Sequence, residues 1–212
     1  LWSSGFIATK YALAGAEPLT FLFIRMVAVV VLMAIIVAIA RPKWPNRTEA
    51  WHSVVAGLLV HGFYLAGTAI AIYHSVPAGL SALIPGLQPI LTSTLANRFL
   101  GERVTPQQWL GLLLGLSGVL LVLHTRQMSG QLGWGWLGTC VALVSITLGT
   151  LYQKRYCSRI DWRTGNLIQF VAAGVLYAIG AVLFETRQVV WSWEFVLGVG
   201  WLVYQGLFRR AA

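Results

Sequence analysis

The stretch LSALIPGLQPILTSTLANRFLGERVTPQQWLGLLLGLSGVLLVL (residues 80–123) is the part of the sequence that decides the fold. Two long apolar runs flank the turn GERVTP, in which Gly101 follows one run and Pro106 begins the next. Gly just after a helix and Pro at its first position are typical of helix ends. A membrane-spanning helix needs about 20 mainly apolar residues. The stretch therefore predicts two transmembrane helices joined by a short polar turn.

The whole chain has the composition of a membrane protein. Of its 212 residues, 58% are hydrophobic and 10% are charged, whereas a soluble domain carries about 25% charged residues. The apolar runs are long and lack the dyad alternation of a membrane β-barrel. We predict an all-α integral membrane protein, surrounded by lipid, with about eight transmembrane helices of which the first is partial. The predicted segments are 1–15, 18–40, 51–73, 78–99, 107–123, 134–152, 164–184 and 190–208.

The basic residues divide the loops into two groups. The loops after the even-numbered segments, with the C-terminal end, carry eleven Lys and Arg residues, whereas the other loops carry Arg126 and Arg187. The positive-inside rule then places the even-numbered loops and the C-terminus in the cytoplasm. The net charge of +9 forms no patch, and because no recognition motif accompanies it we expect no nucleic-acid partner. The eleven residues are Arg41, Lys43, Arg47, Arg98, Arg103, Lys154, Arg155, Arg159, Arg163, Arg209 and Arg210.

The chain also contains an internal repeat. The segments GFIATKY (5–11) and GTLYQKR (149–155) match at an offset of 144 residues, and the same offset pairs IRMVA (24–28) with IQFVA (168–172). The two copies are separated by five crossings of the membrane, so they are inverted relative to each other. Inverted repeats recur in secondary transporters, which bind their substrate near the midplane between the two copies.

Residues 1–13, 17–27 and 80–123 resemble the EamA-type branch of the drug/metabolite transporter superfamily. The resemblance is most specific in the Leu-Gly-Glu-Arg turn, which follows a small-residue helix with a central Pro89 and precedes a Gly-rich helix. It implies ten helices in two inverted repeats of five. We expect the first repeat at 1–124, with a truncated first helix, and an incomplete second repeat at 133–212, with helices six to eight.

The resemblance implies a transporter of small metabolites, an exporter that works by alternating access at a central cavity in the bacterial inner membrane. The alternative is an inert or scaffold membrane fragment, because helices nine and ten of the family lie beyond this chain. An enzyme is not expected, because all six acidic residues lie at span ends and no pair of His residues has metal spacing. We expect no cofactor and no metal. The substrate, the direction of transport, whether export or uptake, the coupling ion and the oligomeric state stay open.

Polar residues within the spans are costly in lipid, so each is a candidate for the cavity. Arg25 lies seven residues into the second segment, where snorkelling to the outer interface is the alternative. The others share helix faces with further polar residues, and hydrogen bonding between helices is their alternative role. The candidate substrate-binding residues are Arg25, His61, Tyr64, Gln88, Thr92 and Gln169.

The fifth segment carries a ridge of small residues formed by Gly111, Gly115 and Gly118. Such a ridge suits close contact with another helix, and the family architecture assigns that contact to the tenth helix. We therefore expect Gly115 to be exposed in this chain, and we expect residues 1–212 alone not to transport.

Overall fold

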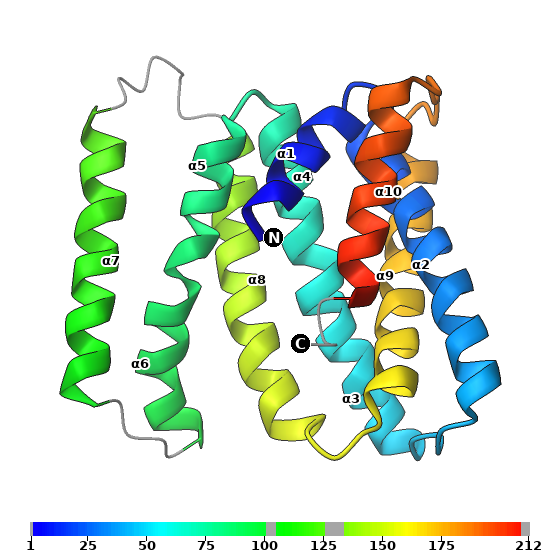
Figure 1. Ribbon diagram of the computed structural model, residues 1–212, viewed down its shortest axis with the longest axis horizontal. Helices are drawn as coiled ribbons and strands as arrows, with labels where there is room; N and C mark the ends of the chain where they lie inside the picture. The colour runs from blue at the N-terminus through cyan, green and yellow to red at the C-terminus, as the bar shows by residue number, and fades with distance from the viewer. Residues whose placement is uncertain (1, 101–104, 126–133, 209–212) are drawn as a thin grey trace.

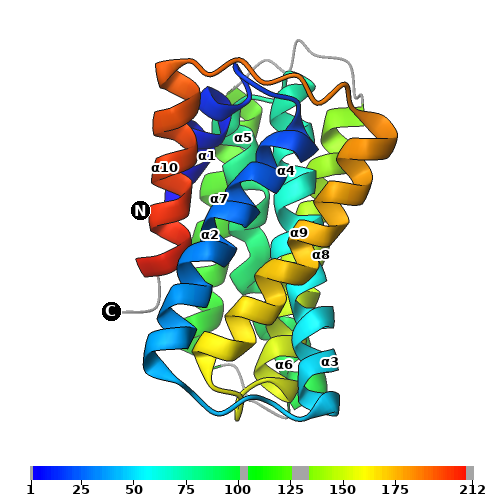
Figure 2. The same ribbon diagram turned by 90° about the vertical axis from the view of Figure 1, so that its right-hand side faces the viewer.

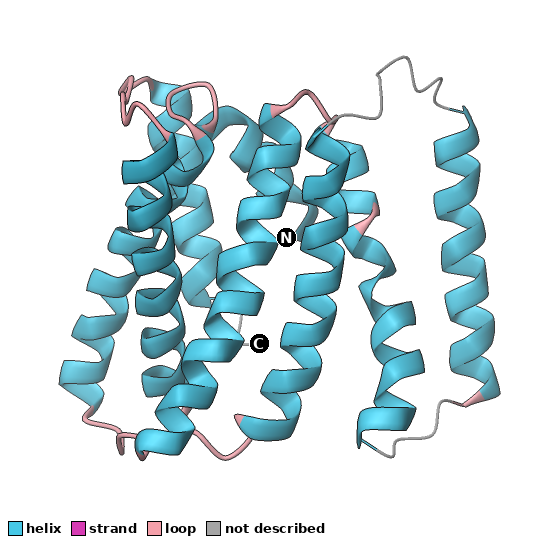
Figure 3. Ribbon diagram, turned by 180° about the vertical axis from the view of Figure 1, so that it is seen from behind, coloured by secondary structure: helices cyan, strands magenta, loops and turns pink. Residues whose placement is uncertain are grey.

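The computed structural model describes residues 2–100, 105–125 and 134–208. Within these residues the regular elements are helices, no β-strand is present, and Ala16 and Val189 form an isolated bridge (Figure 3). The helices stand side by side as a bundle, from which α7 is set apart (Figure 1). In chain order they are α1 (Trp2–Ala12), α2 (Pro18–Ala40), α3 (Arg47–Gly57), η1 (Leu58–Phe63), α4 (Tyr64–Tyr73), α5 (Ala78–Leu83), η2 (Pro85–Leu87), α6 (Gln88–Leu100), α7 (Pro106–Thr125), α8 (Trp134–Tyr156), α9 (Trp162–Phe184) and α10 (Trp193–Phe208).

The all-α membrane fold predicted from the sequence is confirmed. In the part of the chain that the structure describes, four helical stretches are long and apolar enough to cross a membrane. The other four predicted segments are also helical, over shorter or interrupted ranges in the case of α1, α5–α6 and α10. The four qualifying stretches are Pro18–Ala40, Arg47–Tyr73, Gly135–Tyr156 and Trp162–Phe184.

Local sequence signals explain where the helices begin and end. Pro18 occupies the first turn of α2, where a missing N–H removes no intrahelical hydrogen bond. The side chain of Asn46 accepts a hydrogen bond from the backbone N–H of Glu49, whose carboxylate accepts one from the N–H of Asn46, so that a capping box starts α3. Arg41 ends α2 in the left-handed conformation, with φ of 43°.

Two of the predicted helices are interrupted, contrary to the single helices expected over 51–73 and 78–99. In the first, the π-helical turn η1 separates α3 from α4. In the second, η2 separates α5 from α6 at Pro85. Pro85 has no N–H to donate and its ring crowds the preceding turn, so a continuous α-helix cannot pass through it without distortion.

Helices of residues 1–124, the predicted first repeat, pack against helices of residues 133–212, the predicted second. The most extensive contacts join α2 to α9, α4 to α8 and α1 to α10, and the pair α2 and α9 is seen side by side in Figure 2. Buried Phe21, Met26 and Val29 of α2 share one apolar core with Phe170 and Tyr177 of α9. The bundle is therefore held together by helices from both predicted repeats.

Contacts made by equivalent glycines follow the same offset of 144 residues. A Cβ at Gly5 would lie 2.8 Å from the side-chain oxygen of Gln205, on α10. A Cβ at Gly149 would lie 2.6 Å from a methyl group of Val60, on η1. The offset pairs Val60 with position 204, which is next to Gln205 in sequence. The contact of α1 with α10 near Gly5 therefore resembles the contact of α8 with η1 near Gly149.

Helix α7 takes little part in this packing. Its exposed glycines Gly111, Gly115 and Gly118 have no atom of the described residues within 4 Å of a built Cβ. The expected exposure of Gly115 is therefore confirmed.

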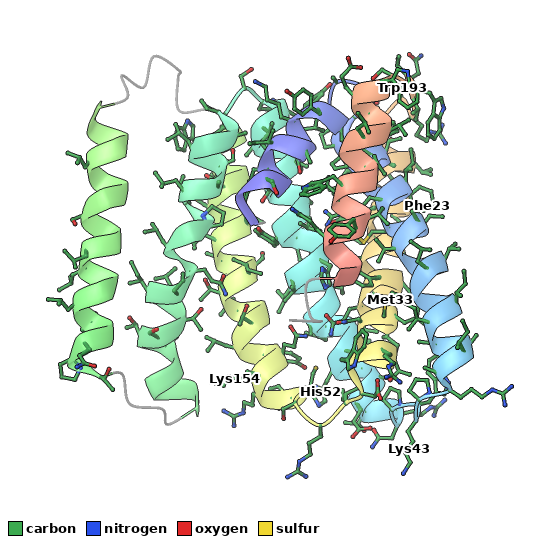
Figure 4. The ribbon with its side chains drawn as sticks, viewed as in Figure 1. Phe23, Met33, Lys43, His52, Lys154 and Trp193 are labelled. Carbon is green, nitrogen blue, oxygen red and sulfur yellow. The ribbon has the colours of Figure 1, made fainter. Side chains whose placement is uncertain are left out.

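The two groups of loops lie at opposite ends of the bundle. The basic loops between α2 and α3 and between α8 and α9 lie at the same end, and Figure 4 places Lys43 and Lys154 there. Trp193 and the loop between α9 and α10 lie at the other end (Figure 4).

Candidate functional site

A cavity with several polar lining residues opens at the basic end of the bundle, between the end of α8 and the start of α9. Its volume is about 370 Å³, within the range of small-molecule sites. Amide, hydroxyl and charged side chains lie in its wall beside apolar surface, and Figure 4 shows Lys154 at this end. The lining includes Thr150, Gln153, Lys154, Asp161, Asn166 and Gln169.

Gln169 is the most deeply buried of these polar residues, with 2% of its surface exposed. Its Oε1 atom is buried and has no hydrogen-bond partner among the described residues. The backbone of Gln169 lies against α3, where a Cβ at Gly57 would be 2.5 Å from the Cα of Gln169. Glycine at position 57 is thus required for α3 to approach α9 closely. A buried acceptor at the wall of a cavity can receive a hydrogen bond from an N–H or O–H group of a bound molecule.

Gln88 is connected to the same cavity through Thr150. Its Nε2 atom donates a hydrogen bond to the hydroxyl of Thr150 at 3.0 Å, and that hydroxyl donates to the carbonyl oxygen of Ile146 at 2.7 Å. Thr92 lies one helical turn after Gln88, on the face of α6 that packs against α8, and its Oγ1 is buried without a partner among the described residues. Gln88 and Thr92 therefore belong to the contact between α6 and α8, next to the cavity.

Arg25 and His61 lie in a second group, between α2, η1 and α9. Arg25 is 9% exposed and lies in the neighbourhood of the fully buried Tyr177. That hydroxyl donates to the carbonyl oxygen of Gly62 at 2.7 Å and also to that of His61. The ring of His61 packs against the ring of Phe170, with centroids 4.6 Å apart. Tyr177 thus satisfies carbonyl groups of the π-helical turn from the neighbouring helix.

The structure divides the six predicted residues between these places. Gln169 lines the cavity, Gln88 and Thr92 adjoin it, and Arg25 and His61 face the interior around Tyr177. Tyr64, 5% exposed, packs on α8 against Ala142 and Ile146 instead. The structure therefore places Arg25, His61, Tyr64 and Gln88 in different surroundings within the bundle, and their role in substrate binding stays a prediction.

Arg25 and Gln169 occupy equivalent positions in the two copies of the repeat. They are related by the offset of 144, and each lies seven residues into its helix, about 10 Å from where that helix begins. Because α2 and α9 cross antiparallel, Arg25 lies toward one end of the bundle and Gln169 toward the other. The cation Arg25 and the neutral amide Gln169 thus occupy positions that are equivalent by the offset of 144 residues.

Apart from Gln169, the residues that line the cavity, Thr150 among them, were not among the candidates predicted from the sequence, and neither was Tyr177. A signal for Tyr177 exists, because Asn166, Gln169 and Tyr177 follow one another at intervals of three and eight residues on one helical face. Thr150 likewise precedes Gln153 by three residues on α8. Among the residues that the structure describes, no group of three or more His, Cys, Asp and Glu side chains could hold a metal ion.

Comparisons with known proteins identify related transporters. The chain is similar to the uncharacterized inner membrane transporter YedA of Escherichia coli K12, at 23% identity, and the match covers 97% of this chain and 67% of the relative. It is also similar to the uncharacterized transporter YvbV of Bacillus subtilis 168, at 28% identity over 96% of this chain and 70% of the relative. A third relative, the probable amino-acid metabolite efflux pump of Escherichia coli K12, is 28% identical over 74% of this chain and 51% of its own length.

The fold is also known from experiment in another protein. A crystal structure matches this one with a TM-score of 0.67 at 23% sequence identity, over 97% of this chain and 70% of that chain. The profile of the EamA-like transporter family matches residues 1–124, which contain the LGER turn and more than half of the chain. The chain therefore belongs to the EamA-like transporter family.

Proposed function

We propose that this protein exports a small polar metabolite across the bacterial inner membrane. The observation that carries the proposal is the cavity between α8 and α9, whose lining includes Gln169, a residue with a buried Oε1 that has no hydrogen-bond partner among the described residues. The cavity opens at the end with the basic loops, which the positive-inside rule assigns to the cytoplasm. A substrate entering from the cytoplasm would meet this cavity first.

The charges around the cavity suit a zwitterionic substrate. Lys154 can attract a carboxylate, whereas Asp161 and the amide oxygen of Gln169 can receive an ammonium group. Asp161 also accepts a hydrogen bond from the backbone N–H of Arg163 at 2.9 Å, which fixes its carboxylate at the start of α9. Amino acids and their derivatives have this combination of groups, and one relative is named as an amino-acid metabolite efflux pump.

The transport mechanism in this proposal is alternating access between two inverted repeats, at 1–124 and 133–212. The matching contacts of Gly5 and Gly149 and the equivalent positions of Arg25 and Gln169 support the division. Related halves that rock against each other expose a central site first to one side of the membrane and then to the other. Arg25, on the half of the path away from the cytoplasm, would attract the carboxylate there.

Amino-acid release from cells that express the complete protein tests the proposal, because residues 1–212 alone are expected not to transport. Cells are supplied with dipeptides, and the amino acids released into the medium are measured by mass spectrometry. Gln169→Leu should lower release about 5-fold to 100-fold, the range expected when a buried hydrogen bond to a ligand is lost. Gln88→Leu should also lower it, with expression intact. Gln188→Leu, on the exposed loop between α9 and α10, is the matched control. Unchanged release in the Gln169 variant, with folding intact, would contradict the proposal.

The alternative is a membrane protein without transport activity of its own. It is favoured by α7, whose glycine face meets no described residue, so that the bundle is open on that side. In that case release would stay at the level of cells without the protein for every amino acid, although the protein inserts and folds.

A further inference from the structure

A second cavity lies at the same end of the bundle, between the end of α2 and the start of α9, on the surface away from α8. Its volume is about 460 Å³. The walls are apolar and are formed by Ala34, Val37 and Ala38 of α2 and by Leu167 of α9. Ala34 and Ala38 are one turn apart and both are exposed, so they form the floor of a groove that runs along the helix.

The groove changes from apolar to basic where α2 ends. Arg41, the residue that follows α2, and Trp44 lie at this mouth, and both are exposed. The neighbouring Lys43 is exposed at the same end (Figure 4). Trp side chains favour the level of the lipid headgroups, and exposed basic residues near a span end lie at the membrane surface. The groove therefore passes from the depth of the acyl chains to the depth of the phosphates.

The equivalent corner at the opposite end of the bundle is closed by a carboxylate. The offset of 144 residues pairs Arg41 with Glu185, the residue that follows α9. Glu185 accepts hydrogen bonds from the backbone N–H groups of Leu19 and Thr20 at 2.7 Å each, and thereby joins the end of α9 to the start of α2. At the end of the bundle that holds the groove, the position equivalent to Glu185 is occupied by the cation Arg41. An anion from outside the chain is the group that this corner attracts.

We propose that this groove is a binding site for an anionic phospholipid. One acyl chain lies along Ala34, Val37, Ala38 and Leu167, and the phosphate is paired with Arg41 beside Trp44. The bound lipid joins the end of α2 to the start of α9, as Glu185 does at the other end. Anionic lipids are enriched in the cytoplasmic leaflet, the side to which the basic loops are assigned. The proposal depends on membrane insertion and not on the transported substrate.

Quenching of Trp44 fluorescence by brominated lipids tests the site. The purified protein is placed in vesicles that contain either brominated phosphatidylglycerol in phosphatidylcholine or brominated phosphatidylcholine in phosphatidylglycerol. The difference between the protein and its Trp44→Phe variant isolates Trp44 from the other tryptophans. We expect brominated phosphatidylglycerol to occupy the site about 5-fold more readily than brominated phosphatidylcholine, as estimated for one basic residue at a membrane surface.

Variants at Arg41 separate a specific site from general attraction. Arg41→Asn removes the charge and keeps a residue that tolerates the left-handed backbone of this position, so it should abolish the preference. Arg41→Lys should retain it. Arg159→Asn is the matched control, because Arg159 is exposed in a loop at the same end but does not line the groove.

Three results would overturn the proposal. The first is equal quenching of Trp44 by the two brominated lipids in the unmodified protein. The second is an equal loss of preference in the Arg41→Asn and Arg159→Asn variants, which would show diffuse attraction. The third is protection of Trp44 from both lipids together with a change of oligomeric state in Arg41→Asn, which would show that a second copy of the chain covers the groove.

Discussion

The Glu185 carboxylate binds both polar groups that Thr20 presents at the start of α2. Its Oε2 atom accepts hydrogen bonds from the backbone N–H and from the hydroxyl of Thr20, each at 2.7 Å. Its Oε1 atom accepts a third bond, from the N–H of Leu19 at 2.7 Å. The first N–H groups of a helix have no partner within that helix. A residue at the end of α9 thus caps α2, the helix that the sequence offset of 144 residues pairs with α9.

Replacing Glu185 by Gln should destabilise the fold. The neutral amide has one acceptor oxygen in place of two, and it loses the favourable interaction of a negative charge with the start of a helix. We expect the free energy of unfolding in detergent to fall by about 1–3 kcal/mol, the range for hydrogen bonds to a charged group. Glu194→Gln, at an exposed position on the same end, is the control. An equal effect of the two substitutions would show that this is a general effect of charge.

Glu17 should give the protein a stability that depends on pH. The hydroxyl and the N–H of Thr186 both donate to its Oε2 at 2.7 Å. These bonds, the one from the hydroxyl first, favour the ionised carboxylate and hold the pKa of Glu17 below its ordinary value of 4.5. The folded state therefore binds the proton more weakly than the unfolded state does. The stabilisation is present above pH 4.5 and is lost as the pH falls through the lowered pKa.

The measurement compares unfolding midpoints of the unmodified protein and of Glu17→Gln over a series of pH values. At neutral pH the variant should be the less stable of the two, and the difference should shrink below pH 4.5. A difference that stays constant through this range would mean that ionisation of Glu17 contributes nothing to stability.

The helices that the sequence predicts best are those whose ends carry their own signals. For α2 the predicted and observed bounds coincide at Pro18–Ala40, because Pro18 begins an unbroken apolar run and Arg41 ends it. The third predicted segment began at residue 51, four residues late, because the capping box of Asn46 and Glu49 lies in a polar stretch before the apolar run. The π-helical turn η1 was not predicted. It depends on the hydroxyl of Tyr177, more than 100 residues away in the chain, and hydropathy does not report such a contact.

The candidate site was predicted as a set of polar residues but not as an arrangement. Polarity within a span shows that a side chain avoids lipid, so Gln169, Gln88 and Arg25 were found. Which helix each side chain meets depends on how closely the backbones approach, and that is decided by glycines such as Gly57, which contacts Gln169. Small residues are too common in membrane helices for their sequence alone to identify the partner. The association of Gln88 with Thr150 could therefore be found only in the structure.

The orientation of the protein in the membrane can be tested by labelling single cysteines. Cys140 and Cys157 are first replaced by Ser. A cysteine at Asn46 or at Ser158, both exposed at the basic end, should react with a membrane-impermeant maleimide only when the cytoplasmic side is accessible. A cysteine at Gln188, at the other end, should react in intact cells. Position 127, which was expected to lie outside, falls beyond the described residues. Labelling of Asn46 in intact cells would reverse the assigned orientation and the direction of transport proposed from it.

Glycine-to-alanine substitutions at Gly67 and Gly115 should have opposite effects. Helices α4 and α8 approach closely where Gly67 faces Gly138, and a Cβ at Gly67 would meet the carbonyl oxygen of Gly138 and lie 3.0 Å from the nitrogen of Ala142. These are backbone atoms, so the two helices would have to separate. We expect Gly67→Ala to lower the free energy of unfolding by about 1–3 kcal/mol, as overpacking does in other cores.

Gly115 lies on the open face of α7, where a built Cβ meets no atom of the described residues within 4 Å. Alanine favours a helix over glycine by about 1 kcal/mol, so Gly115→Ala should leave the protein equally or slightly more stable. Thermal unfolding of both variants in the same detergent measures the difference. If Gly115→Ala destabilises the protein as much as Gly67→Ala does, then another helix packs closely on α7 in the membrane, and the open face seen in this structure is covered there.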